Sequence, residues 1–347
     1  MTDLFTPTRL GDIPLANRIV MAPMTRSRSP GGVPNALTAE YYAQRASAGL
    51  IITEGTAPAA LGAGYPNIPA LFDARHVAGW RQVADAVHAR CGRIVVQLMH
   101  TGRIAHEEVL GAQPVGASAI AAPGQIFTGT AMREHSTPRA LTGAEIEHVI
   151  AEYAQAARLA REAGLDGVEI HGANGYLPNQ FLAPNVNDRT DPWGGSIANR
   201  ARFLLAVTDA AVAAIGAGRV GVRLSPGNPF NDIADPDAPA TYAHVMRELS
   251  GRGLAYLHVM NVQPGFDVPA LVRANYQGAV ILNGGYDRAR AEADVAAGVA
   301  AIAFGVPFIA NPDLPARLRD GVALAAPDQA TFYGGDARGY TDYPTAA

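Results

Sequence analysis

The chain has 347 residues, a formal net charge of −4, 48% hydrophobic and 17% charged residues, and a single cysteine, Cys91. This composition is ample for a large buried core, and it excludes a disordered chain, a disulfide framework and a cysteine-held zinc or iron–sulfur centre. The Lys and Arg residues are dispersed, which gives no electrostatic footprint for nucleic acid or an anionic membrane surface.

The first 17 residues precede any strongly apolar run. They lack the apolar segment of a signal peptide, and RLGDIP is typical of a turn, so we expect an N-terminal hairpin over residues 1–17 that closes the bottom of the fold. No stretch reaches the roughly 20 apolar residues that span a bilayer. These features predict a cytoplasmic protein.

Eight short apolar or β-branched runs follow, separated by longer Ala-rich segments. Residues 76–91 and 143–164 have apolar residues at three-and-four spacing, which predicts amphipathic helices. Thr142 is a plausible N-cap with Glu145 as its capping-box partner. The predicted strands are RIVMAP (18–23), LIITEG (50–55), RIVVQLMH (93–100), GVEIHG (167–172), VGVRLS (220–225), YLHVMN (256–261), AVILNGG (279–285) and AAIAFG (300–305).

Buried strands that alternate with helices predict a parallel α/β sheet, and eight such units predict a single closed (β/α)₈ TIM barrel over residues 1–347. A doubly wound open sheet is the competing topology, but the GxGxxG motif after the first strand is absent. Residues 101–141, after the third strand, are rich in Gly, Pro, Ser and Ala and lack helical periodicity. They predict a capping loop or subdomain over the barrel mouth.

Polar residues and glycines gather where the predicted strands end. Active sites of such barrels lie at the carboxyl ends of the strands, so we expect these residues to share one rim. Paired glycines after the last two strands expose backbone N–H groups, and NPDLP can begin a short helix facing the rim. This pattern favours a phosphate site, for a phosphorylated sugar or flavin mononucleotide. The rim residues are Pro23, Met24, Thr25, Gly55, Gln97, His171, Asn174, Tyr176, Arg223, Gly284, Gly285 and Gly305.

Arg223 ends an apolar strand, and a buried arginine must be paired or must face a ligand. Its partner is either a carboxylate at a neighbouring strand end, such as Glu54 or Glu169, or an electron-rich heterocycle that gains negative charge on reduction. Gln97 can supply paired donor and acceptor contacts to the same ring.

Several long motifs make the chain resemble the Old Yellow Enzyme family of FMN-dependent ene-reductases over essentially its full length. It is most similar to the bacterial branch typified by N-ethylmaleimide and nitrate-ester reductases. The motifs are RIVMAPMTRSR, IITEGT, VVQLMHTGR, VRLSP, FIANPDLP, TFYGGDARGYTDYP and the block from PRALTGAEIEH to DPWGGSIANRARF, which includes EIHGANGYLPNQF.

The resemblance implies a tightly bound, non-covalent FMN across the barrel mouth, with NADPH or NADH as a transient reductant. Hydride would pass from FMN N5 to the β-carbon of an alkene activated by a carbonyl or nitro group. The cofactor-binding residues implied are Pro23, Met24, Thr25, Gly55, Gln97 and Arg223 for the ring and Gly284, Gly285, Gly305 and Val306 for the phosphate. In the substrate pocket, His171 and Asn174 would hold the activating oxygen, Tyr176 would protonate the α-carbon, and Met99, Phe332 and Tyr333 would line the walls.

Three positions depart from the family pattern. Val306 stands where the family usually has arginine, which predicts weaker FMN retention unless another basic residue compensates. Met99 replaces a frequent tryptophan and is expected to loosen the substrate pocket. Pro178 and Asn179 change the turn just after Tyr176.

Other functions fit the sequence less well. A dienoyl-CoA reductase needs a cysteine cluster, a sugar-phosphate aldolase or isomerase barrel needs a lysine or paired carboxylates at strand ends, and a flavin storage protein has no use for the His171, Asn174 and Tyr176 set. A barrel acting mainly on nitrate esters, nitro compounds or quinones is the alternative activity. We expect small-molecule substrates and no metal, and a monomer and a homodimer are both compatible with the sequence.

Overall fold

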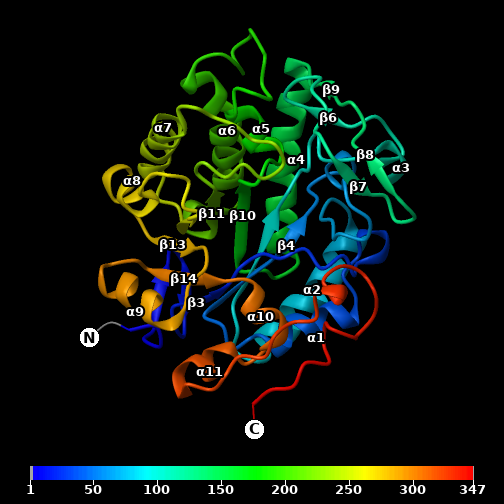
Figure 1. The fold of residues 1–347 in the computed structure, drawn as a ribbon. Coiled ribbons are helices and arrows are strands. Elements are labelled where there is room, and N and C mark those ends of the chain that lie inside the picture. The colour runs from blue at the N-terminus through cyan, green and yellow to red at the C-terminus, as the bar shows by residue number, and fades with distance from the viewer. Residues whose placement is uncertain (1–2, 347) are drawn as a thin grey trace.

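A computed structural model describes residues 3–346, and a closed barrel of eight parallel strands forms its centre (Figure 1). The strands follow one another around the ring in chain order, and the last pairs with the first. The predicted (β/α)₈ barrel is confirmed, and each predicted strand ends within two residues of an observed one. The barrel strands are β3 (Ile19–Met21), β4 (Leu50–Thr56), β5 (Ile94–Leu98), β10 (Gly167–Gly172), β11 (Val220–Leu224), β12 (Tyr256–Met260), β13 (Val280–Asn283) and β14 (Ala301–Phe304).

The lower part of the barrel is filled by small and branched apolar side chains. An N-terminal hairpin of β1 (Thr8–Leu10) and β2 (Ile13–Leu15) packs Leu10, Ile13 and Leu15 against this core. The hairpin therefore closes the bottom of the barrel, as the turn in its sequence predicts. Since this end is sealed with apolar side chains, the polar residues of the strands are confined to the middle and upper end of the interior.

Helices surround the barrel and bury their apolar faces against the outer side of the strands. The α4 capping box between Thr142 and Glu145 is present as predicted. No helix within residues 3–346 is long and apolar enough to cross a membrane. The α-helices are α1 (Ala36–Gln44), α2 (Ala74–His88), α3 (Glu107–Leu110), α4 (Gly143–Glu162), α5 (Leu177–Leu182), α6 (Ile197–Ile215), α7 (Ala238–Ser250), α8 (Val268–Asn275), α9 (Arg288–Ala296), α10 (Val306–Ala310) and α11 (Leu314–Asp320), and short 3₁₀ turns are η1 (Pro30–Gly32), η2 (Ala60–Gly62), η3 (Ala217–Arg219) and η4 (Gln329–Thr331).

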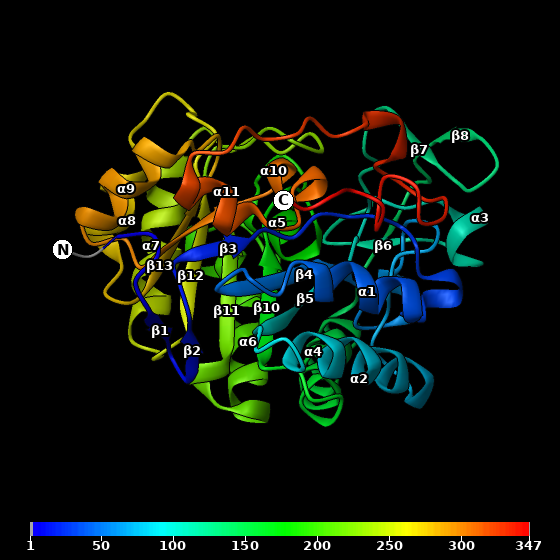
Figure 2. The ribbon, with the colours of Figure 1, turned by 90° about the horizontal axis from the view of Figure 1, so that it is seen from below.

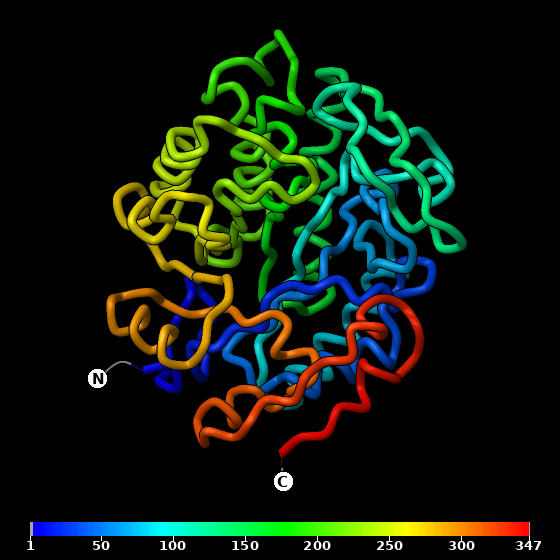
Figure 3. Tube along the Cα trace, viewed as in Figure 1, coloured from blue at the N-terminus to red at the C-terminus, as the bar shows by residue number. Residues whose placement is uncertain are grey.

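The segment between β5 and α4 makes the long excursion expected from its composition (Figure 3). It contains α3, the short parallel pair β6 (Val115–Gly116) and β9 (Arg139–Ala140), and the antiparallel hairpin β7 (Gln125–Phe127) and β8 (Met132–Glu134). Side chains of this segment line a cavity together with rim residues of the barrel. The excursion therefore extends the barrel mouth outward.

The C-terminal segment runs back over the barrel toward α1, where it is anchored by arginine side chains (Figure 2). Arg26, just after β3, donates from Nε to the carbonyl of Phe332 at 2.9 Å and from Nη2 to that of Gly339 at 2.7 Å. Tyr340 stacks on Tyr41 with ring centroids 4.0 Å apart. These contacts hold the last residues of the chain beside the loop that follows the first barrel strand.

Candidate active site

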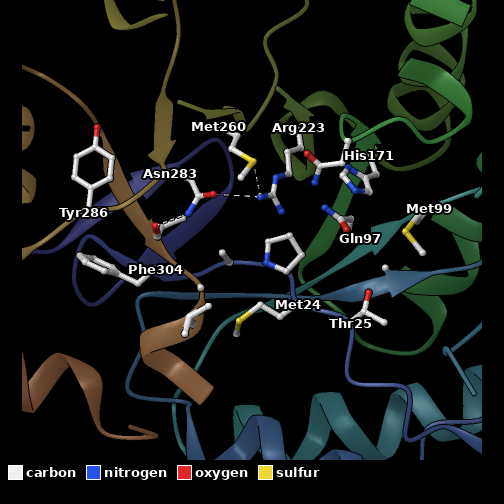
Figure 4. Close-up of a pocket in the computed structure, with 18 of the residues that line it drawn as sticks. Met24, Thr25, Gln97, Met99, His171, Arg223, Met260, Asn283, Tyr286 and Phe304 are labelled. Carbon is white, nitrogen blue, oxygen red and sulfur yellow. Dashed lines mark hydrogen bonds between the residues drawn. The ribbon is translucent and has the colours of Figure 1, made fainter. Parts of the chain in front are cut away.

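A cavity of about 460 Å³ opens at the carboxyl end of the barrel (Figure 4). Ligand sites of this fold lie at this end. The structure brings together every predicted site residue except Phe332 and Tyr333. The cavity is lined by Pro23, Met24, Thr25, Gly55, Gln97, Met99, His171, Asn174, Tyr176, Arg223, Gly284, Gly285, Gly305 and Val306, and also by Met260, Asn283, Tyr286 and Phe304.

The end of β10 and the turn after it carry three of these side chains, His171, Asn174 and Tyr176, and local hydrogen bonds hold the conformation of the turn. Asn174 takes a left-handed backbone conformation with φ of 56°, and its N–H donates to Ser225 Oγ at 2.9 Å. The next N–H, of Gly175, donates to Asn179 Oδ1 at 2.9 Å, while Asn179 Nδ2 donates to Tyr242 Oη at 3.2 Å. Asn179 thus stabilises the turn that positions Tyr176. Pro178 lies in the first turn of α5, where a missing N–H costs nothing.

His171 and Asn174 present uncharged hydrogen-bond donors to the cavity. Asn228 Nδ2 donates to Asn174 Oδ1 at 2.9 Å, which leaves Asn174 Nδ2 free to donate. Burial and the nearby charge of Arg223 hold the pKa of His171 well below its ordinary value, so its imidazole is neutral and carries one N–H. A donor at the end of β10 and a donor in the turn after it therefore line the same cavity, the arrangement that binds an oxygen gaining negative charge.

Tyr176 is 8% exposed, and burial raises the pKa of its phenol. The phenol therefore stays protonated at neutral pH. Its Oη lies 3.3 Å from Tyr65 Oη, and its ring centroid lies 5.0 Å from that of His171. Met99 packs in the same buried cluster as Tyr176. A neutral acid, a donor pair and an apolar wall thus meet at one end of the cavity.

Arg223 faces the cavity from β11 without a direct ion pair. Its Nη2 donates to Asn283 Oδ1 at 3.2 Å, and its buried Nε has no hydrogen-bond partner within residues 3–346. Across the same described range, neither Glu54 nor Glu169 comes within ion-pair distance of it. Since a buried cation with a free donor is costly, this arrangement fits a ligand that accepts hydrogen bonds and carries negative charge.

Glycines after β13 and β14 leave backbone N–H groups open at the opposite end of the cavity. Gly284 has φ of 126°, and a Cβ there would lie 2.2 Å from the Asn261 carbonyl oxygen, so only glycine fits. Arg290 donates to the Gly284 carbonyl at 3.1 Å and brings a cation to this end. NPDLP begins a short helix as expected, since α11 starts at Leu314, but no α11 residue lines this cavity; the helix at this end is α10, which begins at Val306 because Pro307 is tolerated in a first helical turn.

A second cavity, of about 510 Å³, shares Thr25 and Tyr176 with the first. Tyr333 lines it, whereas Phe332 lines neither cavity and contributes its carbonyl to the Arg26 contact. Apolar and aromatic side chains dominate its walls, which include Tyr65, Ile104, Ile126, Phe127 and Phe230. The first cavity therefore adjoins an apolar chamber at Thr25 and Tyr176.

Glu54 fixes the loop that carries Thr25, because its Oε2 accepts the N–H groups of Arg26 and Ser27, both at 3.0 Å. Burial raises the pKa of this carboxyl to about 7, despite hydrogen bonds and nearby arginines that lower it. The folded protein therefore binds a proton that the unfolded chain has already lost near pH 4.5. Protonation of Glu54 therefore stabilises the folded state. This contribution to the free energy of unfolding is fully present below pH 4.5 and is lost as the pH rises through about 7.

We expect Glu54→Gln to remove this dependence, because a carboxamide oxygen accepts the same N–H groups without titrating. Between pH 4.5 and 8 the wild type should lose about 3 kcal/mol of unfolding free energy more than the variant. Denaturant unfolding of both proteins across this range measures the difference. Parallel pH profiles for the two proteins would contradict the prediction.

Some functional residues give no signal in the sequence. Tyr65 lies in a loop without periodicity, and it reaches Tyr176 across 111 positions of the chain. Asn228, which orients the Asn174 carboxamide through a hydrogen bond, lies 54 positions away in the chain. Asn283 lies within a predicted strand, but its contact with Arg223 joins β13 to β11, which are separated by β12 in the barrel. Only the order of the strands around the barrel could have suggested these pairs.

Comparison with known proteins agrees with this geometry. A family model described as the NADH:flavin oxidoreductase / NADH oxidase family matches residues 3–325. The chain belongs to the Old Yellow Enzyme family. The protein is thus an NAD(P)H-dependent flavin oxidoreductase of the Old Yellow Enzyme type, and FMN and NAD(P)H are the cofactors that its family implies.

Three relatives span nearly the whole chain. A probable flavin mononucleotide-dependent alkene reductase from Leishmania infantum is 41% identical over 98% of this chain and 97% of its own length. Morphinone reductase in complex with tetrahydroNAD is 47% identical, with a TM-score of 0.95 over 99% of this chain and 98% of that one. The Old Yellow Enzyme homologue from Zymomonas mobilis is 39% identical, with a TM-score of 0.96 over 99% of both chains.

Proposed function

We propose that this Old Yellow Enzyme family member binds FMN tightly and without a covalent bond in the 460 Å³ cavity, and reduces alkenes activated by a carbonyl or nitro group. The observation that carries the proposal is one cavity holding two neutral donors, His171 and Asn174, a protonated phenol, Tyr176, and a cation with a free donor, Arg223. The cation fits a flavin ring, and the two donors with the phenol fit an alkene that has a polar activating group.

The residues around the cavity fit FMN at both of its ends. Arg223 has an unpartnered Nε, and Gly55 packs so closely on Met99 that a Cβ would lie 2.4 Å from Met99 Sδ, so its backbone lines the cavity without a side chain. The isoalloxazine would lie against Pro23, Met24 and Thr25, with Gly55, Gln97 and Arg223 at its edge. The phosphate would accept hydrogen bonds from the backbone N–H groups of Gly284, Gly285, Gly305 and Val306.

In the proposed reaction, bound FMN supplies a hydride to the β-carbon of the alkene. As charge moves onto the activating oxygen, His171 and Asn174 donate hydrogen bonds to it. Tyr176 then gives its proton to the α-carbon, and its raised pKa keeps that proton available at neutral pH. The carboxamide of NADPH or NADH would use the same two donors, so the reductant must leave before the alkene enters.

The proposal is tested with the purified protein. We expect flavin absorbance bands that bleach with NADPH and recover when 2-cyclohexenone is added without oxygen. A colourless protein that cannot be reconstituted with FMN would refute the cofactor assignment. A flavoprotein that bleaches with NADPH but recovers only with oxygen or a quinone would refute alkene reduction while leaving FMN binding in place.

Val306 leaves the phosphate end of the cavity without the arginine usual in the family, although Arg290 lies nearby. We expect Val306→Arg to tighten FMN binding roughly tenfold, because hydrogen bonds to charged groups contribute about 1.5–3 kcal/mol. Arg290→Gln should weaken binding if Arg290 compensates. Fluorescence titration of apoprotein with FMN measures both changes, with Val306→Met as the uncharged control. Equal affinities for the arginine and methionine variants would contradict the expectation.

A further inference from the structure

The barrel interior just below the main cavity contains a buried carboxylate, Glu169, that the proposed reaction does not use. Glu169 is two residues before His171 on β10, so both side chains point into the barrel. It is fully buried, and the strands on either side of it place Gln97 and Gly221 at the same level. A carboxylate in such a place is costly unless its neighbours satisfy it.

Its hydrogen bonds come from the adjacent strand β5 and from β12, the next strand but one on the other side. Gln97 Nε2, on β5, donates to one carboxylate oxygen of Glu169 at 2.8 Å, and His258 Nδ1, on β12, lies 2.9 Å from the other. The ring of Tyr256 packs against Gly221, where a Cβ would lie 2.3 Å from that ring. Tyr256 thus covers the Glu169 carboxylate from the lower side of the barrel. Glu169 is therefore held in a fixed position by residues from several strands.

Glu169 and Arg223 carry opposite charges in this part of the barrel interior. Burial would raise the pKa of Glu169, but the hydrogen bonds from His258 and Gln97 and the charge of Arg223 outweigh it and lower the pKa. Burial lowers the pKa of His258, so its imidazole is neutral and donates from Nδ1. Glu169 is thus ionised and partly offsets the positive charge of Arg223, although the two make no direct ion pair.

Glu169 also decides which end of the Gln97 carboxamide faces the cavity. An ionised carboxylate only accepts hydrogen bonds, so Gln97 must turn Nε2 toward Glu169 and Oε1 toward the cavity. An acceptor from Gln97 then faces the cavity that Arg223, with its unpartnered Nε, also lines (Figure 4). An imide edge, with an N–H between two carbonyl oxygens, needs this combination, and the pyrimidine ring of a flavin has such an edge.

We propose that Glu169 is a positioning residue for the flavin: it orients Gln97, offsets the charge of Arg223, and so limits how strongly the site favours reduced over oxidised FMN. The inference rests on the proposed FMN site. Reduction adds negative charge to the pyrimidine ring, which Arg223 stabilises and Glu169 opposes. By opposing it, Glu169 keeps bound FMN a stronger reductant toward the alkene.

The test is the midpoint potential of FMN in Glu169→Gln, a change that removes the charge and keeps the volume. We expect the preference for reduced over oxidised FMN to rise about tenfold, which corresponds to about 30 mV for two electrons. Anaerobic equilibration with a reference dye measures it. Tyr256→Phe is the control variant, because it removes the hydroxyl beside Glu169 but keeps the carboxylate charge, and its potential should change less than that of Glu169→Gln.

An unchanged or more negative potential in Glu169→Gln would overturn the inference. The wild type separates this failure from that of the proposed function: a wild-type protein that does not bind FMN refutes the FMN site itself. If Glu169→Gln is too unstable to hold FMN, a double-mutant cycle with Arg223→Gln tests the charge balance instead. Thermal unfolding of the apoproteins then measures the stability of each variant. The double variant should then be more stable than Glu169→Gln alone, and a double variant that is no more stable would contradict the charge balance.

Discussion

Tyr176→Phe is expected to slow alkene reduction about 100-fold or more, while NADPH reduces the bound FMN at nearly the wild-type rate. The ring of Tyr176 packs in a buried cluster with Met99 and Ile104, so phenylalanine keeps the packing and removes only the proton. Anaerobic stopped-flow measurement of the two half-reactions separates the effects. Unchanged turnover of 2-cyclohexenone would show that another group supplies the proton.

Tyr65→Phe is the matched control for this experiment. It removes the hydroxyl that lies 3.3 Å from Tyr176 Oη but leaves Tyr176 itself in place. We expect a smaller loss, confined to the same half-reaction. Because burial raises the pKa of Tyr176, alkene reduction in the wild type should not decline between pH 6 and 9 through ionisation of this phenol.

Asn174→Ala should slow both half-reactions, each on the order of 100-fold, because the nicotinamide carboxamide and the alkene's activating oxygen use the same donors. This outcome differs from that of Tyr176→Phe, which spares reduction by NADPH. The same stopped-flow comparison measures it, with flavin content checked by absorbance. A loss in only one half-reaction would refute the shared use of Asn174.

Asn228→Ala provides a graded test of the same donor. Asn228 donates to Asn174 Oδ1 and so keeps Asn174 Nδ2 turned to the cavity. Without Asn228 the carboxamide can rotate, so we expect a loss of roughly tenfold in both half-reactions, less than for removal of the donor itself. A variant with full activity would mean that the backbone of the turn alone sets the orientation of Asn174.

The barrel and its rim were predictable because both depend on local patterns. Apolar runs marked the eight strands, and in a parallel barrel every strand end lies on one rim, so His171 and Arg223 had to approach each other. The hydrogen bonds that orient the rim were not predictable. The pairs Gln97 with Glu169, and Glu169 with His258, join residues 72 and 89 positions apart, and no periodicity encodes such contacts.

Glu169 shows how one residue can be considered for the wrong role. In the sequence it was a possible ion-pair partner for Arg223, whereas in the structure it binds Gln97 and His258 and acts on Arg223 only through space. The short helix at the phosphate end has a similar origin: NPDLP begins α11 as expected, but the cavity is lined by the start of α10, in a segment that contains Pro307 and lacks helical periodicity. In both cases packing between distant segments decided the outcome.

The Arg26 contacts with the C-terminal segment have a consequence for synthesis of the protein. Arg26 is synthesised long before its partners, because the carbonyls it binds belong to Phe332 and Gly339, 306 and 313 positions later in the chain. The final barrel strand, β14, must likewise find β3, the first. The outer chamber, with Tyr333 in its wall, is therefore completed only after this late segment has been synthesised, and nascent chains that stop short of Phe332 should be inactive even when most of the barrel has formed.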